Sequence, residues 1–348
     1  MLIMMEPNVY VREAILVNKR KGVWFSFVIT RKTLVAIFVV ISITIVSLTT
    51  AALYEPFARR IYGVKPGVTL EVYDMSGLLP DELFDAILSI GEDRVIEAKN
   101  ASFDWQTELV YPEQVGMIID VSATIEALLS AEPGSSIELA HIQVLPSVTQ
   151  SHFVPYYQGP TDEPKVSLMI NVDWGNEYIP TMLDIFAQYN ITTTWFPTGS
   201  WVAKFPELAR LIADAGHEIG NHGGWHGMPS QMTADEVREL ILDGEEKIIN
   251  VTGQKPRVFA PPAGDMNKQT VAIAGELGYK TVLWTVDTVD WQRPAPTVII
   301  DRVMSKIQNG ALVLMHPTEP TAAALPIIIE QLQAKGYQVV TVSELLGP

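Results

Sequence analysis

Two histidines four residues apart, His222 and His226, are the first candidates for chemistry in this sequence. This spacing suits two imidazoles that bind one metal ion, and neutral imidazole nitrogen is a good donor for zinc and its neighbours. Gly223 and Gly224 between them indicate a loop rather than a helix. The 348-residue chain has no cysteine, so any metal has to be held by histidines and carboxylates. The alternative interpretation is a pair of surface histidines without a ligand.

Four further polar residues stand at or just after the end of short apolar runs: Asp173, Asp287, Asp290 and His316. Asp287 and Asp290 offer carboxylates beside the indole of Trp291, and His316 could serve as a general acid. Each residue also has a plainer interpretation. A carboxylate after a strand often only caps the following helix, and a histidine between an apolar strand and a proline is equally consistent with a core position.

The elements that must position these residues begin near residue 166. From there short apolar runs alternate with helical patterns, which is typical of βα units and a parallel sheet. The expected strands are 166–172, 192–197, 217–221, 257–261, 280–286, 311–315 and 337–342. They predict an α/β fold, a TIM-like and incomplete (β/α) barrel, with an open doubly wound sheet as the competitor. In such barrels chemistry takes place at the carboxyl ends of the strands, where the candidate residues fall. No Gly-rich phosphate loop follows the first strand, which argues against a nucleotide-binding open sheet.

Five ordered motifs lie on this scaffold. They are NVDWGNEYIP at 171–180, GHEIGNHGGWH at 216–226, FAPPAG at 259–264, WTVDTVDW at 284–291 and LVLMH at 312–316. In order and spacing they resemble the motifs of the polysaccharide deacetylase family, which is carbohydrate esterase family 4 with its NodB homology domain. The resemblance extends over residues 165–346, more than half of the chain.

The resemblance implies roles for the candidate residues. His222 and His226 would bind a divalent metal ion, with zinc as the first choice, and Asp173 would be the general base. Asp290 would orient His316, the general acid that protonates the leaving amine. The implied reaction is the hydrolysis of an N-acetyl group to acetate and a free amino sugar.

The resemblance also implies a substrate pocket. Trp291 and Leu314 would line it around the acetyl methyl group, and a backbone N–H near Ala263 would bind the oxyanion.

Three positions depart from the family pattern. Trp174 replaces the aspartate that is the third metal ligand, Ala260 replaces an arginine and Ala263 replaces a pocket tyrosine. Because an exposed indole leaves an apolar patch, we expect Trp174 to fill the space at the two alanines. Catalytic zinc normally has three protein ligands, so a nearby carboxylate has to supply the third. The candidates are Asp173, Glu177 and Asp265.

Twenty consecutive residues without charge, 34–53, predict a transmembrane helix, because about 1.5 Å per residue gives roughly the 30 Å of a bilayer core. Residues 1–33 carry six Lys/Arg and two Glu, a net charge of about +4. Since the whole chain has a net charge of −16, the residues after this segment have a net charge of about −20. The positive-inside rule then predicts a cytoplasmic basic tail over 1–33 and a single-pass membrane protein whose large domain is extracytoplasmic. A buried core helix, and a signal sequence cleaved near Ala51, are the alternatives.

Residues 64–150 predict a small α+β domain before the barrel, because strand-like and amphipathic segments alternate there between turn signals. The pattern over 100–149 resembles a peptidoglycan-binding domain, and a stalk without a ligand is the alternative. The segment 151–164 is rich in proline and polar residues, and we interpret it as a linker to the deacetylase-like domain at 165–346.

Together these patterns predict a membrane-anchored, extracytoplasmic deacetylase of N-acetylated cell-wall glycan, most simply peptidoglycan, with an atypical metal site. A catalytically impaired glycan-binding protein on the same fold is the alternative, and a scaffold in a bacterial envelope or spore coat is a third hypothesis. The acidic exterior lacks the basic patch that nucleic acid requires, so no nucleic-acid partner is expected.

Overall fold

The computed structural model describes residues 30–347. Two compact units are distinguished by their internal contacts. The first comprises the described residues up to Val95 together with Ile118–Ile142, and the second comprises Ile96–Met117 and the chain from Gln143 onward. Most of the predicted cytoplasmic tail, residues 1–29, lies outside the described residues.

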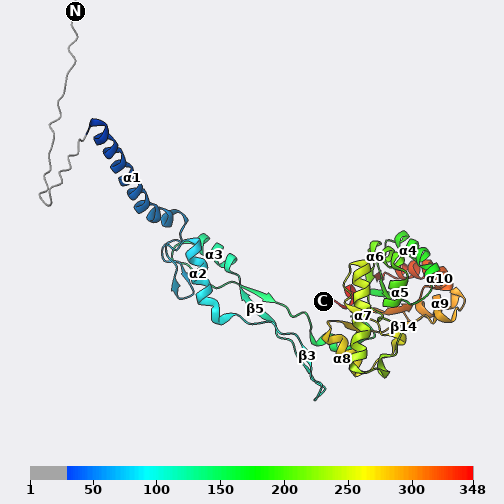
Figure 1. Ribbon diagram of the computed structural model, residues 1–348. Helices are drawn as coiled ribbons and strands as arrows, with labels where there is room; N and C mark the ends of the chain where they lie inside the picture. The colour runs from blue at the N-terminus through cyan, green and yellow to red at the C-terminus, as the bar shows by residue number, and fades with distance from the viewer. Residues whose placement is uncertain (1–29, 348) are drawn as a thin grey trace, which may run out of the picture. The chain divides into compact units, whose positions relative to one another are not determined.

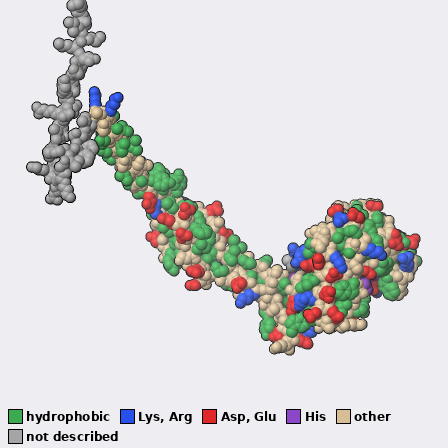
Figure 2. All heavy atoms as spheres, in the orientation of Figure 1, with side chains coloured by type: hydrophobic (Ala, Val, Ile, Leu, Met, Phe, Trp, Pro, Cys, Tyr) green, Lys and Arg blue, Asp and Glu red, His purple; other side chains and the backbone are tan. Residues whose placement is uncertain are grey.

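The first unit begins with α1 (Arg31–Tyr62). Thr30 caps its first turn by accepting a hydrogen bond from the Thr33 backbone N–H at 3.2 Å. Among residues 30–347 it is the one helix that is long and apolar enough to cross a membrane, and none of its apolar window is buried. Figure 2 shows hydrophobic side chains along it and basic side chains at its N-terminal end. These properties fit a membrane anchor or a signal sequence.

The rest of the first unit is a small α+β arrangement. Its elements are β1 (Thr69–Leu70), β2 (Tyr73–Asp74), α2 (Pro80–Gly91), α3 (Val121–Ser130) and β6 (Ser136–Ile137). The strands form one sheet in the order β2-β1-β6. Leu83, Ile87 and Leu128 are fully buried between the helices and this sheet, so the unit has an apolar core of its own. Two further strands, β5 (Gly116–Ile119) and β7 (His141–Val144), pair with each other, and each runs from one unit into the other.

The second unit contains two parallel sheets. The strands are β8 (Pro155–Tyr156), β9 (Lys165–Val172), β10 (Thr194–Pro197), β11 (Glu218–Ile219), β12 (Val258–Phe259), β13 (Lys280–Val282), β14 (Val286–Asp287), β15 (Leu312–Met315) and β16 (Gln338–Val339). One sheet has the order β11-β10-β9-β15-β14, with β16 also on β9, and the other has the order β12-β13-β8. Bridges at Asn221–Phe259 and Gln158–Ala311 join the two sheets, so the strands follow one another around a barrel.

Helices surround these strands (Figure 1). They are α4 (Ile179–Gln188), α5 (Gly199–Lys204), α6 (Pro206–Asp214), α7 (Ala234–Thr252), α8 (Lys268–Glu276), α9 (Pro296–Met304), α10 (Glu319–Ala334) and α11 (Val342–Leu346). The α/β class predicted from the sequence is confirmed, and the strand arrangement agrees with the predicted incomplete barrel.

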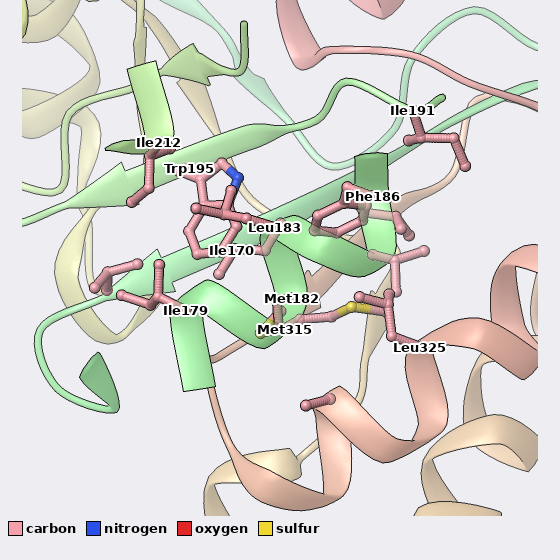
Figure 3. Close-up of a cluster of buried hydrophobic side chains, with 14 of the residues drawn as sticks. Ile170, Ile179, Met182, Leu183, Phe186, Ile191, Trp195, Ile212, Met315 and Leu325 are labelled. Atoms are coloured by element: carbon pink, nitrogen blue, oxygen red, sulfur yellow. The ribbon is translucent and has the colours of Figure 1, made fainter. Parts of the chain in front are cut away.

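Alternation along β9 determines the two layers of the core. Ile170 and its alternate neighbours point toward the helices, where they pack with Trp195, Phe186 and Met182 (Figure 3). Met169 points to the other side of the sheet, into a separate apolar cluster with residues of β10, β13 and β15. A strand buried on both faces reads as a continuous apolar run, which is why its position follows directly from the sequence.

The segment 151–164 is part of the fold, so the interpretation of it as a linker is wrong. Within it β8 pairs with β13, and the Leu283 N–H donates to the Tyr156 carbonyl at 2.7 Å. The preceding hairpin of β3 (Ser102–Phe103) and β4 (Val110–Tyr111) belongs to the same unit, where Ala101 N–H donates to the Val148 carbonyl at 2.9 Å. Proline and polar residues conceal these short strands because two paired residues leave no periodic pattern.

Candidate functional site

The loop after β11 holds the two histidines of the predicted metal pair. The rings of His222 and His226 lie 5.5 Å apart, centroid to centroid. His222 is buried, and its Nδ1–H donates to the Ala260 carbonyl at 2.6 Å, which leaves Nε2 with a lone pair. Burial lowers the pKa of His222 to about 3, so its imidazole is neutral near pH 7. His222 therefore has the tautomer and charge of a metal ligand, with His226 beside it at the surface.

The ends of β14 and β15 bring the second predicted pair together. Asp290 is fully buried, and its Oδ1 accepts a 2.7 Å hydrogen bond from His316 Nδ1. Its Oδ2 accepts from the His316 backbone N–H at 2.7 Å and from the Thr321 hydroxyl at 2.5 Å. The carboxylate thereby fixes the ring orientation of His316 and places the proton on Nδ1. His316 Nε2 remains available to a ligand.

Backbone strain surrounds Asp290. Val289 and Arg293, on either side of the 3₁₀ turn Asp290–Gln292, both have φ of 52°, a left-handed conformation that residues other than glycine rarely adopt, and least of all the β-branched Val289. The guanidinium of Arg302 donates to the Thr288 carbonyl at 2.7 Å and supports the same segment. Strained residues of this kind cluster at functional sites, where the surrounding structure holds them in place.

Asp173, the predicted general base, follows β9 at the surface. Its Oδ1 accepts a 2.6 Å hydrogen bond from the hydroxyl of Thr198, which is buried at the start of α5. The same Thr198 oxygen caps α5 by accepting from the Trp201 N–H at 3.2 Å. Thr198 therefore orients the Asp173 carboxylate, a role not identified from the sequence although the Thr-Gly-Ser start of a helix is a recognisable N-cap signal.

Trp174 is not the buried filler that the sequence predicts. Its side chain is 39% exposed, and its ring lies parallel to that of His316 at 7°, with centroids 5.7 Å apart. The expectation fails because Ala263 is itself exposed and offers no closed space to fill, although Ala260 is buried. Trp174 instead packs on the predicted general acid.

The structure also does not supply the third metal ligand expected from nearby carboxylates. Both oxygens of Asp265 are held by Ser230, through its backbone N–H at 2.8 Å and its hydroxyl at 2.7 Å. Glu177 points to solvent on the surface of the loop after β9. Within residues 30–347, no group of three or more His, Asp or Glu side chains is placed to hold a metal ion. The site thus offers two imidazoles where catalytic zinc normally has three protein ligands, and the donor set does not fit a catalytic zinc ion.

The predicted pocket residues lie in different surroundings. Trp291 is 54% exposed beside Asp290, whereas Leu314 is buried in β15. Ala263 is exposed with φ of 56° in the loop after β12. Their contact with an acetyl group stays a prediction. Another residue on β9, Asn171, was not identified from the sequence: it is buried, and its Oδ1 has no hydrogen-bond partner among the described residues.

Comparison with known proteins identifies the family. The family model described as polysaccharide deacetylase matches residues 158–282. A peptidoglycan-N-acetylglucosamine deacetylase of Bacillus cereus is 34% identical over 196 residues, which are 55% of this chain and 92% of the relative. The chain belongs to the polysaccharide deacetylase family. Its resemblance to that family is thereby confirmed for the barrel, and its relatives include deacetylases of peptidoglycan N-acetylglucosamine and of peptidoglycan N-acetylmuramic acid.

Three further similarities extend beyond the barrel. A Bacillus subtilis protein of uncharacterised function, YlxY, is 39% identical over 270 residues, covering 76% of this chain and 84% of YlxY. The crystal structure of BA3943 from Bacillus anthracis, described as a family 4 pseudoenzyme, has a TM-score of 0.56 at 36% identity and covers 76% of this chain and 95% of that one. A mutant of BA3943 described as having restored enzymatic activity matches with the same TM-score at 35% identity, over 76% of this chain and 98% of its own.

Proposed function

We propose that this member of the family binds N-acetylated cell-wall glycan at the carboxyl ends of the barrel strands and hydrolyses the acetamide bond weakly or not at all. The observation that carries this proposal is the side chain at position 174. An indole there stacks on His316, in the position where the family pattern has its third metal ligand. With two histidine donors left, metal affinity has to fall.

The rest of the site supports retained recognition of the glycan. Asp290 still holds His316 through two hydrogen bonds, and Thr198 still holds Asp173. Burying a carboxyl group such as that of Asp290 is costly unless it is hydrogen-bonded, and here both of its oxygens accept hydrogen bonds. The site therefore keeps an oriented imidazole, His316, at the carboxyl ends of the strands.

A deacetylase with an atypical metal site is the second candidate, and the state of His222 favours it. Its neutral ring has Nδ1 committed to Ala260 and Nε2 free, which is the state that metal binding requires. In that case His222 and His226 would hold a divalent ion weakly. Asp173 would accept a proton from the attacking water, and His316 would protonate the leaving amine.

We further propose that α1 anchors the chain in a membrane, with residues 54–348 outside the cytoplasm. Its apolar surface and the excess of Lys/Arg before it support this orientation. The small α+β domain predicted over residues 64–150 would bind peptidoglycan, as the resemblance of residues 100–149 suggests. Wall binding that persists when the barrel site is disabled would support this role of residues 64–150, and complete loss of binding would refute it.

The proposed function is tested with the full chain in detergent micelles and purified peptidoglycan sacculi. We expect the chain to co-sediment with sacculi and to release no acetate above the blank when zinc, cobalt or manganese is added. Failure to co-sediment would refute glycan binding. Catalytic acetate release that is abolished in His222→Ala would establish the second candidate instead.

A further inference from the structure

Two exposed indoles flank the His316–Asp290 pair. Trp174, 39% exposed, stacks on the His316 ring, and Trp291, 54% exposed, follows Asp290 directly in the chain. Asp290 bonds both the backbone and the ring of His316, and the Trp174 ring stacks on that same ring, so the loops after β9, β14 and β15 meet at His316. We call Trp174, His316 and Trp291 the aromatic platform.

The Trp174 part of the platform is held rigidly. Gly175 has φ of 85°, and a Cβ there would lie 2.1 Å from the Pro317 carbonyl oxygen, so the loops after β9 and β15 are in close contact. One residue further on, Asn176 accepts a 3.0 Å hydrogen bond from the indole N–H of the buried Trp201. A rigid aromatic side chain gives contact area at a low cost in conformational entropy.

The geometry of the stack leaves indole surface for a ligand. Contacting carbon atoms lie about 3.5–4.0 Å apart, so parallel rings whose centroids are 5.7 Å apart are offset. Trp174 is therefore covered only in part by His316. Solvent-exposed indole surface is unfavourable in water and marks a binding surface when several such rings gather.

The occupant that fits this surface is a neutral N-acetylated pyranose chain. A pyranose ring presents axial C–H groups on its faces and hydroxyl groups at its edge, so it stacks on an indole while its edge forms hydrogen bonds. Asp173, next to Trp174, offers a carboxylate acceptor for hydroxyl or amide N–H groups. The part of the chain after the basic tail has a net charge of −20, which opposes an anionic ligand but leaves a neutral glycan unaffected.

We propose that Trp174, at the position of the missing metal ligand, is a sugar-stacking residue, and that the aromatic platform binds the faces of N-acetylated pyranose units in a neutral glycan chain. The proposal rests on the proposed function and deepens it. The substitution that removes a metal ligand thereby supplies binding surface, so loss of hydrolysis and gain of stacking arise from one residue.

Isothermal titration calorimetry of the full chain in detergent micelles with chitotetraose tests the proposal. We expect Trp174→Ala and Trp291→Ala each to weaken binding by about tenfold, and Trp174→Phe, which keeps a ring, to stay within about threefold of the wild type. Tyr189→Ala is the aromatic control. Tyr189 follows α4, at the end of the barrel opposite to the carboxyl ends of the strands, and its hydroxyl donates to Glu330 at 2.7 Å, so its loss should leave affinity unchanged.

Co-sedimentation with sacculi separates failure of this inference from failure of the proposed function. If the wild type binds sacculi and chitotetraose, and Trp174→Ala binds both equally well, the platform is refuted while the glycan-binding function stands. If the wild type binds sacculi but not chitotetraose, the platform is also refuted. If the wild type binds neither, the proposed function fails together with the platform. Unfolding temperatures within about 2 °C of the wild type would exclude misfolding as the cause of lost binding.

Discussion

Replacing Asp290 by alanine should destabilise the barrel far more than replacing its neighbour Asp287. Asp290 has a fully buried carboxylate with three hydrogen bonds, two from His316 and one from Thr321. Its loss leaves two His316 N–H donors without their acceptor, whereas the Thr321 hydroxyl can turn to Thr318, 2.8 Å away. Unsatisfied buried donors cost about 1–3 kcal/mol each, so the expected loss is about 3–5 kcal/mol.

Asp287 provides the control within the same segment. It is half-buried, and its Oδ1 accepts one hydrogen bond, from the Val289 N–H at 2.7 Å. Asp287→Ala should therefore cost about 1 kcal/mol or less. Asp290→Asn keeps one acceptor oxygen but places an amide against His316, so its cost should lie between the two.

Thermal unfolding of the full chain, followed by circular dichroism, measures these differences. A domain of this size loses about 2–4 °C in Tm per kcal/mol, so Asp290→Ala should lower the barrel transition by about 10 °C. The reasoning would be refuted if Asp290→Ala and Asp287→Ala shifted the transition equally. In that case the hydrogen bonds of Asp290 would not be holding the ends of β14 and β15 together.

Other parts of the chain give expectations of the same kind. Gly175→Ala should cost about 2–4 kcal/mol in unfolding free energy, since the new Cβ meets the Pro317 carbonyl. Gly216→Ala, with φ of 83° and open space around it, should cost only about 1 kcal/mol, and equal costs would refute the clash. Burial lowers the pKa of His217 to about 4, so its neutral form stabilises the fold above pH 6.5, and that contribution is lost as pH falls toward 4. Between pH 7.5 and 5 the unfolding free energy should fall by about 2 kcal/mol for this reason. His217→Phe should lose correspondingly less stability over that interval, and an unchanged pH dependence in this variant would contradict the lowered pKa of His217. Protease added to intact protoplasts of an expressing host should degrade residues 54–348, and their protection alongside cytoplasmic controls would reverse the proposed orientation.

The barrel was predictable because its central strands, β9, β10 and β15, are buried on both faces and bear continuous apolar runs. The run 280–286 is different: it divides into β13, which pairs with β8, and β14, which pairs with β15. A single apolar run cannot reveal that change of partner. The strand β8 was missed for a related reason, because two paired residues in a proline-rich segment are too few to show the hydrophobic alternation of a strand.

The site was predictable where side chains act in pairs at strand ends. The structure brings His222 close to His226 and bonds Asp290 to His316, because parallel strands deliver these residues to one end of the barrel. The environment of Trp174 was not predictable. Its exposure depends on which side chains of the surrounding loops lie against the indole. The sequence does not show that Ala263 faces solvent, nor that the His316 ring lies where Trp174 can stack on it.

The metal content of the purified full chain tests the central claim most directly. After incubation with one equivalent of zinc and gel filtration, mass spectrometry of the metal should find well below one zinc per wild-type chain. Trp174→Asp, which restores a carboxylate beside the two histidines, should retain close to one, and His222→Ala in that background should lose it again. A wild-type chain that keeps one zinc per molecule, and loses it in His222→Ala, would contradict the account.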